Sequence, residues 1–198
     1  MSAPPGISGQ YVNINSGGDE VAWLPVAKAK HFTNAFVVDE KGQRILLGYK
    51  KRGIGQDLWN GFGGKVEEGE TVTQAAAREL KEECGIEGRP VPCGFLLFTT
   101  AQNTSFSFFI HIFRVEEWTG EPVETDEMRP KWFSTNPDQT TSESDSPSIP
   151  YDGMWADDIY WLPKLLAKIP FQGRADFSVE ENGPSGGAMV KWWFGEQV

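Results

Sequence analysis

The sequence predicts an α/β fold in which a mixed β-sheet is sandwiched between α-helices. Two observations predict it. Short runs rich in β-branched and aromatic residues lie on both sides of one stretch of strong helix formers, and a second helix-like stretch is followed by more strand-like runs. With 198 residues, of which 39% are hydrophobic, the chain has the size of one ordinary domain with appendages.

The first elements are a hairpin and a helix. Residues 32–38 and 44–49 are strand-like, and the polar residues 39–43 between them are typical of a turn. Residues 71–83 are good helix formers, and Gly85 is positioned to end the helix. The apolar residues of this stretch recur near helical spacing, which predicts a buried face: Val72, Ala75, Ala76, Leu80 and Cys84.

A second helix is expected to start with the acidic pair Asp157 and Asp158 and to run to Pro170. Pro163 must then lie in the first turn of this helix or kink it. Further strands are expected at 94–100, 105–115, 130–134, 175–180 and 188–194.

The predicted organisation is one domain over residues 31–198 with two appendages. Residues 1–30 are rich in Gly, Pro, Ser and Ala, so we expect an N-terminal arm that is flexible, or docked through residues 21–24. Residues 135–150 contain little that could be buried, which indicates a surface insertion.

Charge and cysteine content exclude several classes of protein. The formal net charge of −10 argues against binding of long nucleic acid, and no apolar run is long enough to span a membrane. A polyanionic ligand would therefore need local neutralisation, for which a divalent cation held by carboxylates is suited. Cys84 and Cys93 are too few for a disulfide framework, and the N-terminus does not resemble a secretory signal, so we expect an intracellular protein. His31 and His111 lack zinc-ligand spacing.

Three carboxylates share one face of the predicted helix. Glu79, Glu82 and Glu83 lie at positions i, i+3 and i+4, and their mutual repulsion would be relieved by a hard divalent ion such as Mg²⁺. The spacing alone favours a solvated acidic face paired with Arg78 and Lys81, because such faces are common on surface helices.

The full spacing over residues 64–86 resembles the signature of the Nudix hydrolases. The pattern is Gly, five residues, Glu, seven residues, Arg-Glu, an aliphatic residue, any residue, Glu-Glu, any residue, Gly and an aliphatic residue, and every fixed position matches. The resemblance implies a Mg²⁺-dependent hydrolase of nucleoside diphosphate derivatives, with Mn²⁺ as a substitute. Glu79, Glu82 and Glu83 would be metal ligands. Gly64, Glu70, Arg78 and Gly85 would be structural, with Glu70 pairing with Arg78.

Other runs resemble the eukaryotic branch that hydrolyses oxidised purine nucleoside triphosphates, the 8-oxo-dGTP diphosphatases. They lie at 47–53, 59–65, 125–130, 154–158 and 160–161. This likeness implies that Glu127 and Gly63 join the metal site. It also implies a set of substrate-binding residues: Asn60, Asp157, Asp158, Trp155, Lys50, Thr33 and Phe98.

Three positions depart from that branch. Ile54 and Thr100 stand where the branch has pocket aromatics, and Phe108 replaces a methionine. The chemistry is unaffected by these changes, but the base preference depends on them. Asp157 and Asp158 have a physical rationale as base readers, because two adjacent carboxyls can share one proton and then act as donor and acceptor. The same pair could instead stabilise a helix N-terminus.

The resemblance implies hydrolysis of 8-oxo-dGTP and 2-oxo-dATP to the monophosphate and pyrophosphate, which removes oxidised nucleotides from the pool before they damage DNA. Glu83, Glu127 or Glu82 would accept the proton of the attacking water. One alternative is a Nudix hydrolase of another nucleoside diphosphate derivative, such as a dinucleotide polyphosphate or ADP-ribose. Another is a binding module without catalysis, although that class would be expected to have a damaged signature. We expect a monomer with a small-molecule nucleotide as its partner, located in the cytoplasm, with the nucleus and mitochondria as further locations.

Overall fold

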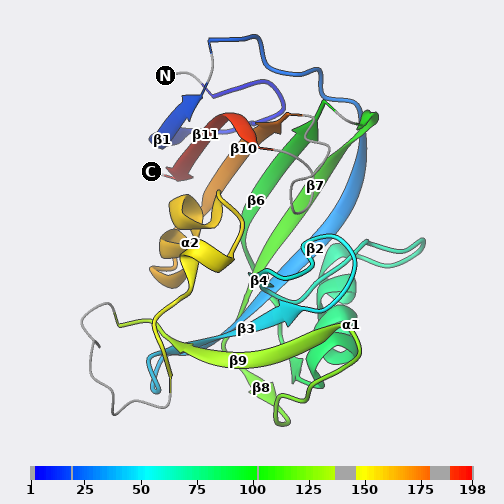
Figure 1. The fold of residues 1–198 in the computed structure, drawn as a ribbon, viewed down its shortest axis with the longest axis vertical. Coiled ribbons are helices and arrows are strands. Elements are labelled where there is room, and N and C mark those ends of the chain that lie inside the picture. The colour runs from blue at the N-terminus through cyan, green and yellow to red at the C-terminus, as the bar shows by residue number, and fades with distance from the viewer. Residues whose placement is uncertain (1–2, 19, 102, 137–145, 179–187, 198) are drawn as a thin grey trace. The chain divides into compact units, whose positions relative to one another are not determined.

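The structure is a computed structural model that describes residues 3–18, 20–101, 103–136, 146–178 and 188–197. Its helices are α1 (Val72–Cys84), α2 (Asp158–Leu166) and the short 3₁₀ helix η1 (Tyr151–Gly153). Its strands are β1 (Tyr11–Gly18), β2 (Lys28–Asp39), β3 (Arg44–Lys50), β4 (Trp59–Asn60), β5 (Glu87–Gly88), β6 (Val91–Thr100), β7 (Asn103–Val115), β8 (Trp118–Thr119), β9 (Met128–Ser134), β10 (Phe171–Phe177) and β11 (Met189–Gln197). Figure 1 shows these elements along the chain.

The chain divides into two compact units. The first unit contains Met1–Phe32, Cys93–Ile112 and Ala156–Val198, and the second contains Thr33–Pro92 and Phe113–Trp155. The long strands β2 and β7 contribute residues to both units. Each unit is described by itself below.

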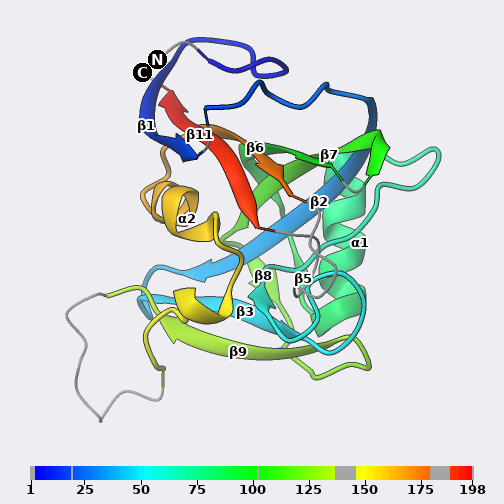
Figure 2. The same cartoon turned by 45° about the horizontal axis from the view of Figure 1, so that its top comes forward.

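In the first unit the hydrogen-bonded strand order is β1-β11-β10-β6-β7. Strand β10 runs parallel to β6 and antiparallel to β11, so the predicted mixed sheet is confirmed. Helix α2 packs against β10 and β11, as Figure 2 shows. The sequence did not predict β1, which lies inside the N-terminal arm and pairs antiparallel with β11.

A buried ion pair holds the described part of the arm. Arg174 is fully buried and pairs with Asp176 at 3.1 Å. Its Nη1 donates to the carbonyl oxygen of Pro5 at 2.6 Å, and Nη2 donates to that of Leu24. Asp176 in turn accepts from the backbone N–H of Leu24 at 2.6 Å. The arm is therefore docked through its main chain, and the indole of Trp23 lies under the guanidinium.

In the second unit the order is β2-β3-β4, and β9 pairs antiparallel with β3. The predicted hairpin is present as β2 and β3, which pair from Asp39 with Arg44 onward. Helix α1 buries its predicted apolar face in the core of this unit. The core residues are Ala35, Val37, Leu46, Phe62, Ala76, Leu80, Cys84, Ile86, Phe113, Val115 and Met128.

Local signals set the ends of α1. Thr71 is the N-cap, and its side chain forms a reciprocal capping box with Gln74. Gly85 has a φ of 76°, a left-handed conformation that favours glycine, and its N–H donates to the carbonyl oxygen of Lys81. The helix predicted over residues 71–83 is therefore present, and Gly85 ends it as predicted.

Helix α2 differs from expectation. It ends at Leu166 rather than continuing to Pro170. Of the two positions expected for Pro163, the first turn is excluded, because Pro163 lies further inside the helix. The early end has a local cause, since Lys168 has a φ of 58° and a helix cannot continue through a left-handed residue.

The predicted surface insertion falls largely outside the described residues, which omit 137–145. Its flanks lie in the second unit and are close together, because the Ser134 N–H donates to the Pro147 carbonyl oxygen at 2.7 Å.

Candidate functional site

The candidate site is built on the loop that precedes α1 and on one face of α1. Arg78 binds Glu70 through two donors, at 2.7 Å and 3.1 Å, and it also contacts Glu79 at 2.8 Å and Glu82 at 3.1 Å. The guanidinium holds the pKa of Glu70 below its usual range. This is the loop-to-helix contact that the sequence predicts for Glu70 and Arg78.

Glu79 lies directly against Gly64. A Cβ on Gly64 would approach Glu79 Oε1 to 2.4 Å, so no larger residue fits at this position without a shift. Burial raises the pKa of Glu79, and the Arg78 guanidinium opposes that effect. A larger residue at position 64 would therefore displace the Glu79 carboxylate from its present position.

Glu83 is the most buried of the three helix carboxylates, at 3% exposure. Its Oε1 accepts from Lys50 Nζ at 2.6 Å, and its Oε2 accepts from the N–H of Gly63 at 2.8 Å. Burial raises the pKa of Glu83, and the Lys50 ammonium opposes the shift. The structure thus brings together Glu83, Lys50 and Gly63, which are far apart in sequence.

Glu127 joins this group from the loop before β9. Lys50 Nζ lies 3.5 Å from its Oε2, and Arg52 forms an ion pair with its other oxygen. The hydrogen bond from Arg52 lowers the pKa of Glu127. Thr125 positions the loop, because its hydroxyl donates to the Glu83 carbonyl oxygen at 3.1 Å and accepts from the Glu127 N–H at 3.3 Å.

In this structure the carboxylates face basic side chains rather than one another. Within the described residues, no group of three or more His, Cys, Asp or Glu side chains is gathered closely enough to hold a metal ion. The donor chemistry nevertheless fits a hard divalent cation, since every candidate ligand offers oxygen and the buried Glu83 shares its cationic partner Lys50 with Glu127.

The second unit also holds Asn60 in a defined orientation. Asn60 Oδ1 accepts from Asn34 Nδ2 and from the Gly61 N–H, both at 2.8 Å, which turns the Asn60 NH₂ group away as a donor. In the described part of the chain, Thr33 Oγ1 and Asn34 Oδ1 are buried without a hydrogen-bond partner. Such orphaned polar atoms are expected where a polar ligand binds. Trp155 lies beside Gly55, whose added Cβ would be 3.2 Å from the indole.

The remaining predicted substrate residues belong to the first unit. Asp157 and Asp158 are 1% and 2% exposed. Asp157 Oδ2 accepts from Trp161 Nε1 at 2.8 Å, while its Oδ1 is buried without a hydrogen-bond partner among the described residues. Burial raises the pKa of Asp157 to about 6, against the opposing hydrogen bond from Trp161. Phe98 packs edge-on against Phe177, with ring centroids 5.3 Å apart.

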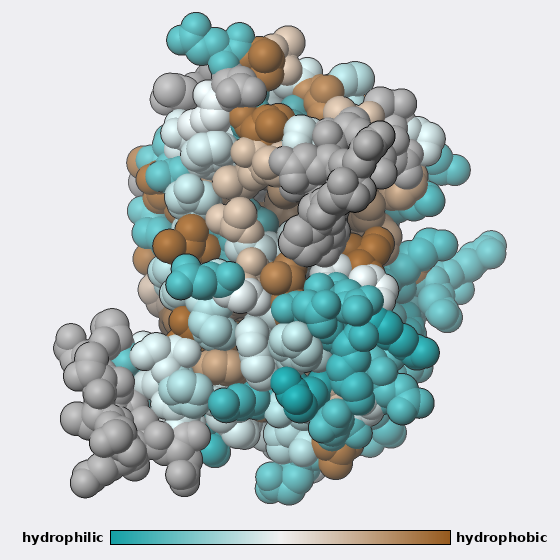
Figure 3. Space-filling model, in the orientation of Figure 1, coloured by the Kyte–Doolittle hydropathy of each residue, from teal (hydrophilic) through white to brown (hydrophobic). Residues whose placement is uncertain are grey.

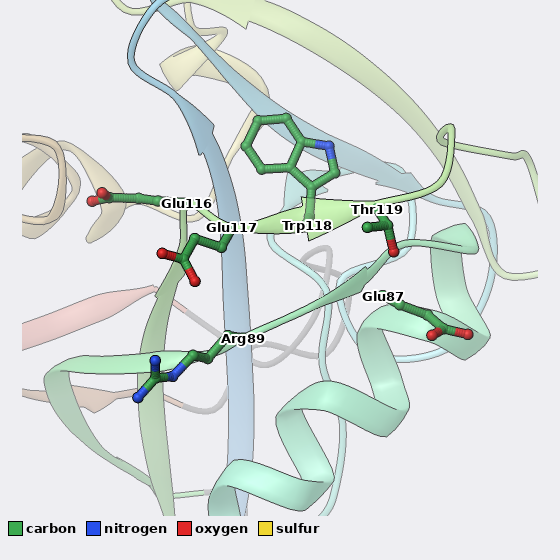
Figure 4. Close-up of a pocket in the computed structure, with 6 residues that line it drawn as sticks. All are labelled: Glu87, Arg89, Glu116, Glu117, Trp118 and Thr119. Atoms are coloured by element: carbon green, nitrogen blue, oxygen red, sulfur yellow. The ribbon is translucent and has the colours of Figure 1, made fainter.

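A surface pocket lies elsewhere in the second unit. It has a volume of about 460 Å³, lies at the β5–β8 ribbon of the second unit, and is lined by none of the predicted site residues. Figure 4 shows its lining: Glu87, Arg89, Glu116, Glu117, Trp118 and Thr119. By contrast, hydrophilic side chains gather over the region of β4 and α1 (Figure 3). We therefore assign the site from its chemistry and not from surface shape.

Sequence reasoning missed three residues in the second unit. Arg52 binds Glu127, Thr125 positions Glu127, and Asn34 orients Asn60. For Arg52 a signal existed, because residues 50–52 form a basic run in an acidic chain. Asn34 and Thr125 have no comparable signal, since an isolated polar residue does not reveal its partner.

The two histidines are not isolated. In the first unit His31 Nδ1 and His111 Nε2 lie 2.9 Å apart, brought together by β2 and β7. Burial lowers the pKa of His111, and the neighbouring His31 adds to this effect.

Comparison with known proteins shows the family to which the chain belongs. The NUDIX domain family matches residues 28–139, more than half of the chain. The protein therefore belongs to the Nudix hydrolase family, which confirms the resemblance, the fold and the hydrolase class predicted from the sequence. Nudix hydrolases generally use divalent metal ions.

Two animal proteins and one solved bacterial structure are similar to this chain. The chain is similar to "Oxidized purine nucleoside triphosphate hydrolase" from Danio rerio, with 47% identity over 135 residues, covering 68% of this chain and 79% of that protein. The protein of the same name from Mus musculus is 41% identical over 140 residues, covering 70% of this chain and 82% of its own. The solved mMutator MutT protein from Bacillus halodurans shares the fold, with a TM-score of 0.61, 20% identity, and coverage of 83% of this chain and 97% of its own.

Within the described residues, no helix is both long enough and apolar enough to cross a membrane.

Proposed function

We propose that this Nudix hydrolase converts oxidised purine nucleoside triphosphates, such as 8-oxo-dGTP and 2-oxo-dATP, to the monophosphate and pyrophosphate in a Mg²⁺-dependent reaction. One observation carries the proposal. The short segment from Asn60 to Gly64 presents a fixed amide at one end, while Gly63 and Gly64 at the other end contact the carboxylates Glu83 and Glu79. Base recognition and phosphate chemistry are thus linked within one segment, and the names of the two animal relatives agree with this assignment.

The phosphate side of the proposal rests on the helix carboxylates. Glu79, Glu82 and Glu83, together with Glu127 and the Gly63 backbone, would hold Mg²⁺, with Mn²⁺ as a substitute. A bound divalent cation would neutralise phosphate charge and favour attack of water at phosphorus. Glu83, Glu127 or Glu82 accepts the proton of that water, and Lys50 lies near the phosphates.

The base side rests on the fixed amide of Asn60 and on the buried Thr33 hydroxyl, which has no hydrogen-bond partner among the described residues. Asn60 and Thr33 of the second unit bind the purine edge, and Trp155 provides an aromatic surface. For Asp157, Asp158 and Phe98 of the first unit we propose the same class of ligand. The raised pKa of Asp157 fits a proton that Asp157 shares with Asp158 near neutral pH. A buried carboxyl that keeps its proton can donate to a keto oxygen while its neighbour accepts from an N–H.

The decisive experiment compares turnover of 8-oxo-dGTP, 2-oxo-dATP, dGTP, a dinucleotide polyphosphate and ADP-ribose with Mg²⁺ and with excess chelator. We expect the oxidised triphosphates to be preferred and all turnover to vanish in chelator. Preference for ADP-ribose or the dinucleotide would assign the chain to another Nudix substrate class. No turnover of any compound would indicate a binding module.

A matched pair of variants tests the carboxylates. Glu83→Gln should lose several orders of magnitude in turnover while the protein remains folded, because Glu83 is buried among Lys50 and Gly63. Glu67→Gln is the control, since Glu67 is exposed and contacts the loop through its backbone N–H. Unchanged turnover in Glu83→Gln, measured by pyrophosphate release, would refute the assignment.

The proposal also includes a monomer acting in the cytoplasm, with the nucleus and mitochondria as further locations.

A further inference from the structure

Three consecutive basic residues lie at the end of β3, and each has an acidic partner within the second unit. Lys50 pairs with Glu83 at 2.6 Å, and Lys51 pairs with Glu124 at 2.9 Å. Arg52 pairs with Glu127. Two of the three partners, Glu83 and Glu127, are proposed metal ligands, whereas Glu124 is not. Two of these basic residues therefore neutralise part of the site.

Arg52 differs from Lys50 in its freedom to move. The side chain of Arg52 is 62% exposed, whereas that of Lys50 is 17% exposed and lies between Glu83 and Glu127. Arg52 precedes Gly53, where an added Cβ would meet nothing within 4 Å, so the loop around it is open. A long exposed side chain in open space can change partners at little cost.

Arg52 and a divalent cation compete for the same carboxylate. Arg52 binds one oxygen of Glu127, and Lys50 already lies 3.5 Å from the other. Positive charges held a few ångströms apart repel, so occupation of Glu127 by a cation disfavours Arg52 in its present position. A triphosphate offers the guanidinium a better partner, because phosphate oxygens accept two parallel hydrogen bonds from arginine.

We propose that Arg52 is a displaceable counter-ion of the metal site. It neutralises Glu127 in the ligand-free protein and moves to the triphosphate once Glu127 ligates a divalent cation. This inference rests on the proposed function for its nucleotide half only. Arg52 is then a binding and positioning residue whose removal has opposite effects on the two ligands: metal binding tightens, and nucleotide binding weakens.

Arg52→Met tests both effects. Mn²⁺ binding without nucleotide is measured by the electron paramagnetic resonance signal of free Mn²⁺, and KM and kcat are measured separately for 8-oxo-dGTP. We expect Mn²⁺ affinity to rise by up to about fivefold, the scale of an exposed ion pair. We expect KM to rise about tenfold or more, the scale of a charge-assisted hydrogen bond, with a smaller change in kcat.

Lys51→Met is the matched control. It removes the same charge one residue away, but Lys51 contacts Glu124 and the Thr125 carbonyl oxygen rather than the Glu127 carboxylate. Mn²⁺ affinity should therefore remain at the wild-type value. Arg52→Lys keeps the charge but loses the planar fork, so Mn²⁺ affinity should stay near wild type while KM still rises.

The outcomes separate this inference from the proposed function. Unchanged or weaker Mn²⁺ binding in folded Arg52→Met overturns the inference, even if wild-type turnover of 8-oxo-dGTP is normal. An unchanged KM overturns the transfer to the triphosphate. Absence of turnover in the wild type would overturn the proposed function, while tighter Mn²⁺ binding in Arg52→Met would still support Arg52 as the counter-ion of Glu127.

Discussion

Asp157→Asn should remove a pH-dependent loss of stability. Asp157 is 1% exposed, and burial raises its pKa from 3.8 to about 6 in the folded protein. Between these two values the unfolded chain loses its proton while the folded protein keeps it, so the unfolded state is favoured as pH rises. Each tenfold change in the ionisation constant corresponds to about 1.4 kcal/mol, which makes the total effect about 3 kcal/mol.

The variant keeps the local structure, because an asparagine oxygen can still accept from Trp161 Nε1, which now donates to Asp157 at 2.8 Å. Urea unfolding of wild type and Asp157→Asn, compared from pH 4 to pH 8, should show nearly equal stabilities near pH 4. Above pH 4 the free energy of unfolding of the variant should exceed that of the wild type by a growing margin. The margin should reach up to about 3 kcal/mol above about pH 6.

Asp152→Asn is the control, since Asp152 is an exposed acid close in sequence, and this variant should not reproduce the stability gain of Asp157→Asn. A difference between Asp157→Asn and wild type that does not change with pH, or a wild type that is the more stable protein at pH 8, would refute the reasoning.

Three further predictions concern other residues of the structure. Asp158→Asn should reduce turnover of oxidised guanine and oxidised adenine nucleotides by unequal factors of roughly tenfold to a hundredfold, with unchanged metal dependence; equal small losses on every nucleotide would indicate a helix-stabilising role only. Arg174→Met should lower the free energy of unfolding by about 3–5 kcal/mol, because it leaves the buried carboxylate of Asp176 unpaired. It should also expose the arm to limited proteolysis, because Arg174 binds the Pro5 and Leu24 carbonyl oxygens. An arm that stays protected would contradict this. Thr71→Ala should cost about 1 kcal/mol in thermal unfolding through loss of the capping box, whereas Thr73→Ala, at an exposed position inside α1, should not.

The sequence by itself determined the elements that depend on local interactions. The capping pair Thr71 and Gln74, the apolar spacing of α1 and the left-handed Gly85 act within a few residues, so the helix and its ends could be read from the chain. The three carboxylates on one face follow from the same periodicity. The Nudix signature is equally local, which is why the class of protein could be predicted before the fold was known.

Strand β1 and the partners that dock the arm could not be predicted, because both depend on residues far away in the chain. Tyr11–Gly18 becomes a strand through pairing with β11, and Arg174 binds Pro5 across 169 positions. The polar composition of residues 1–30 indicates only that little is buried there. It does not show that a buried guanidinium takes up main-chain carbonyl oxygens of the arm.

Only the tertiary structure decided which charges meet at the site. Lys50 and Glu83 are 33 positions apart, and Arg52 and Glu127 are 75 apart. Whether a basic side chain meets a carboxylate depends on the pairing of β3 with β9 and on how α1 packs against the same core, and these long-range choices leave no periodic signal in the sequence. The carboxylates and their neighbour Arg78 could therefore be identified from their spacing, whereas the distant counter-ions Lys50 and Arg52 could not.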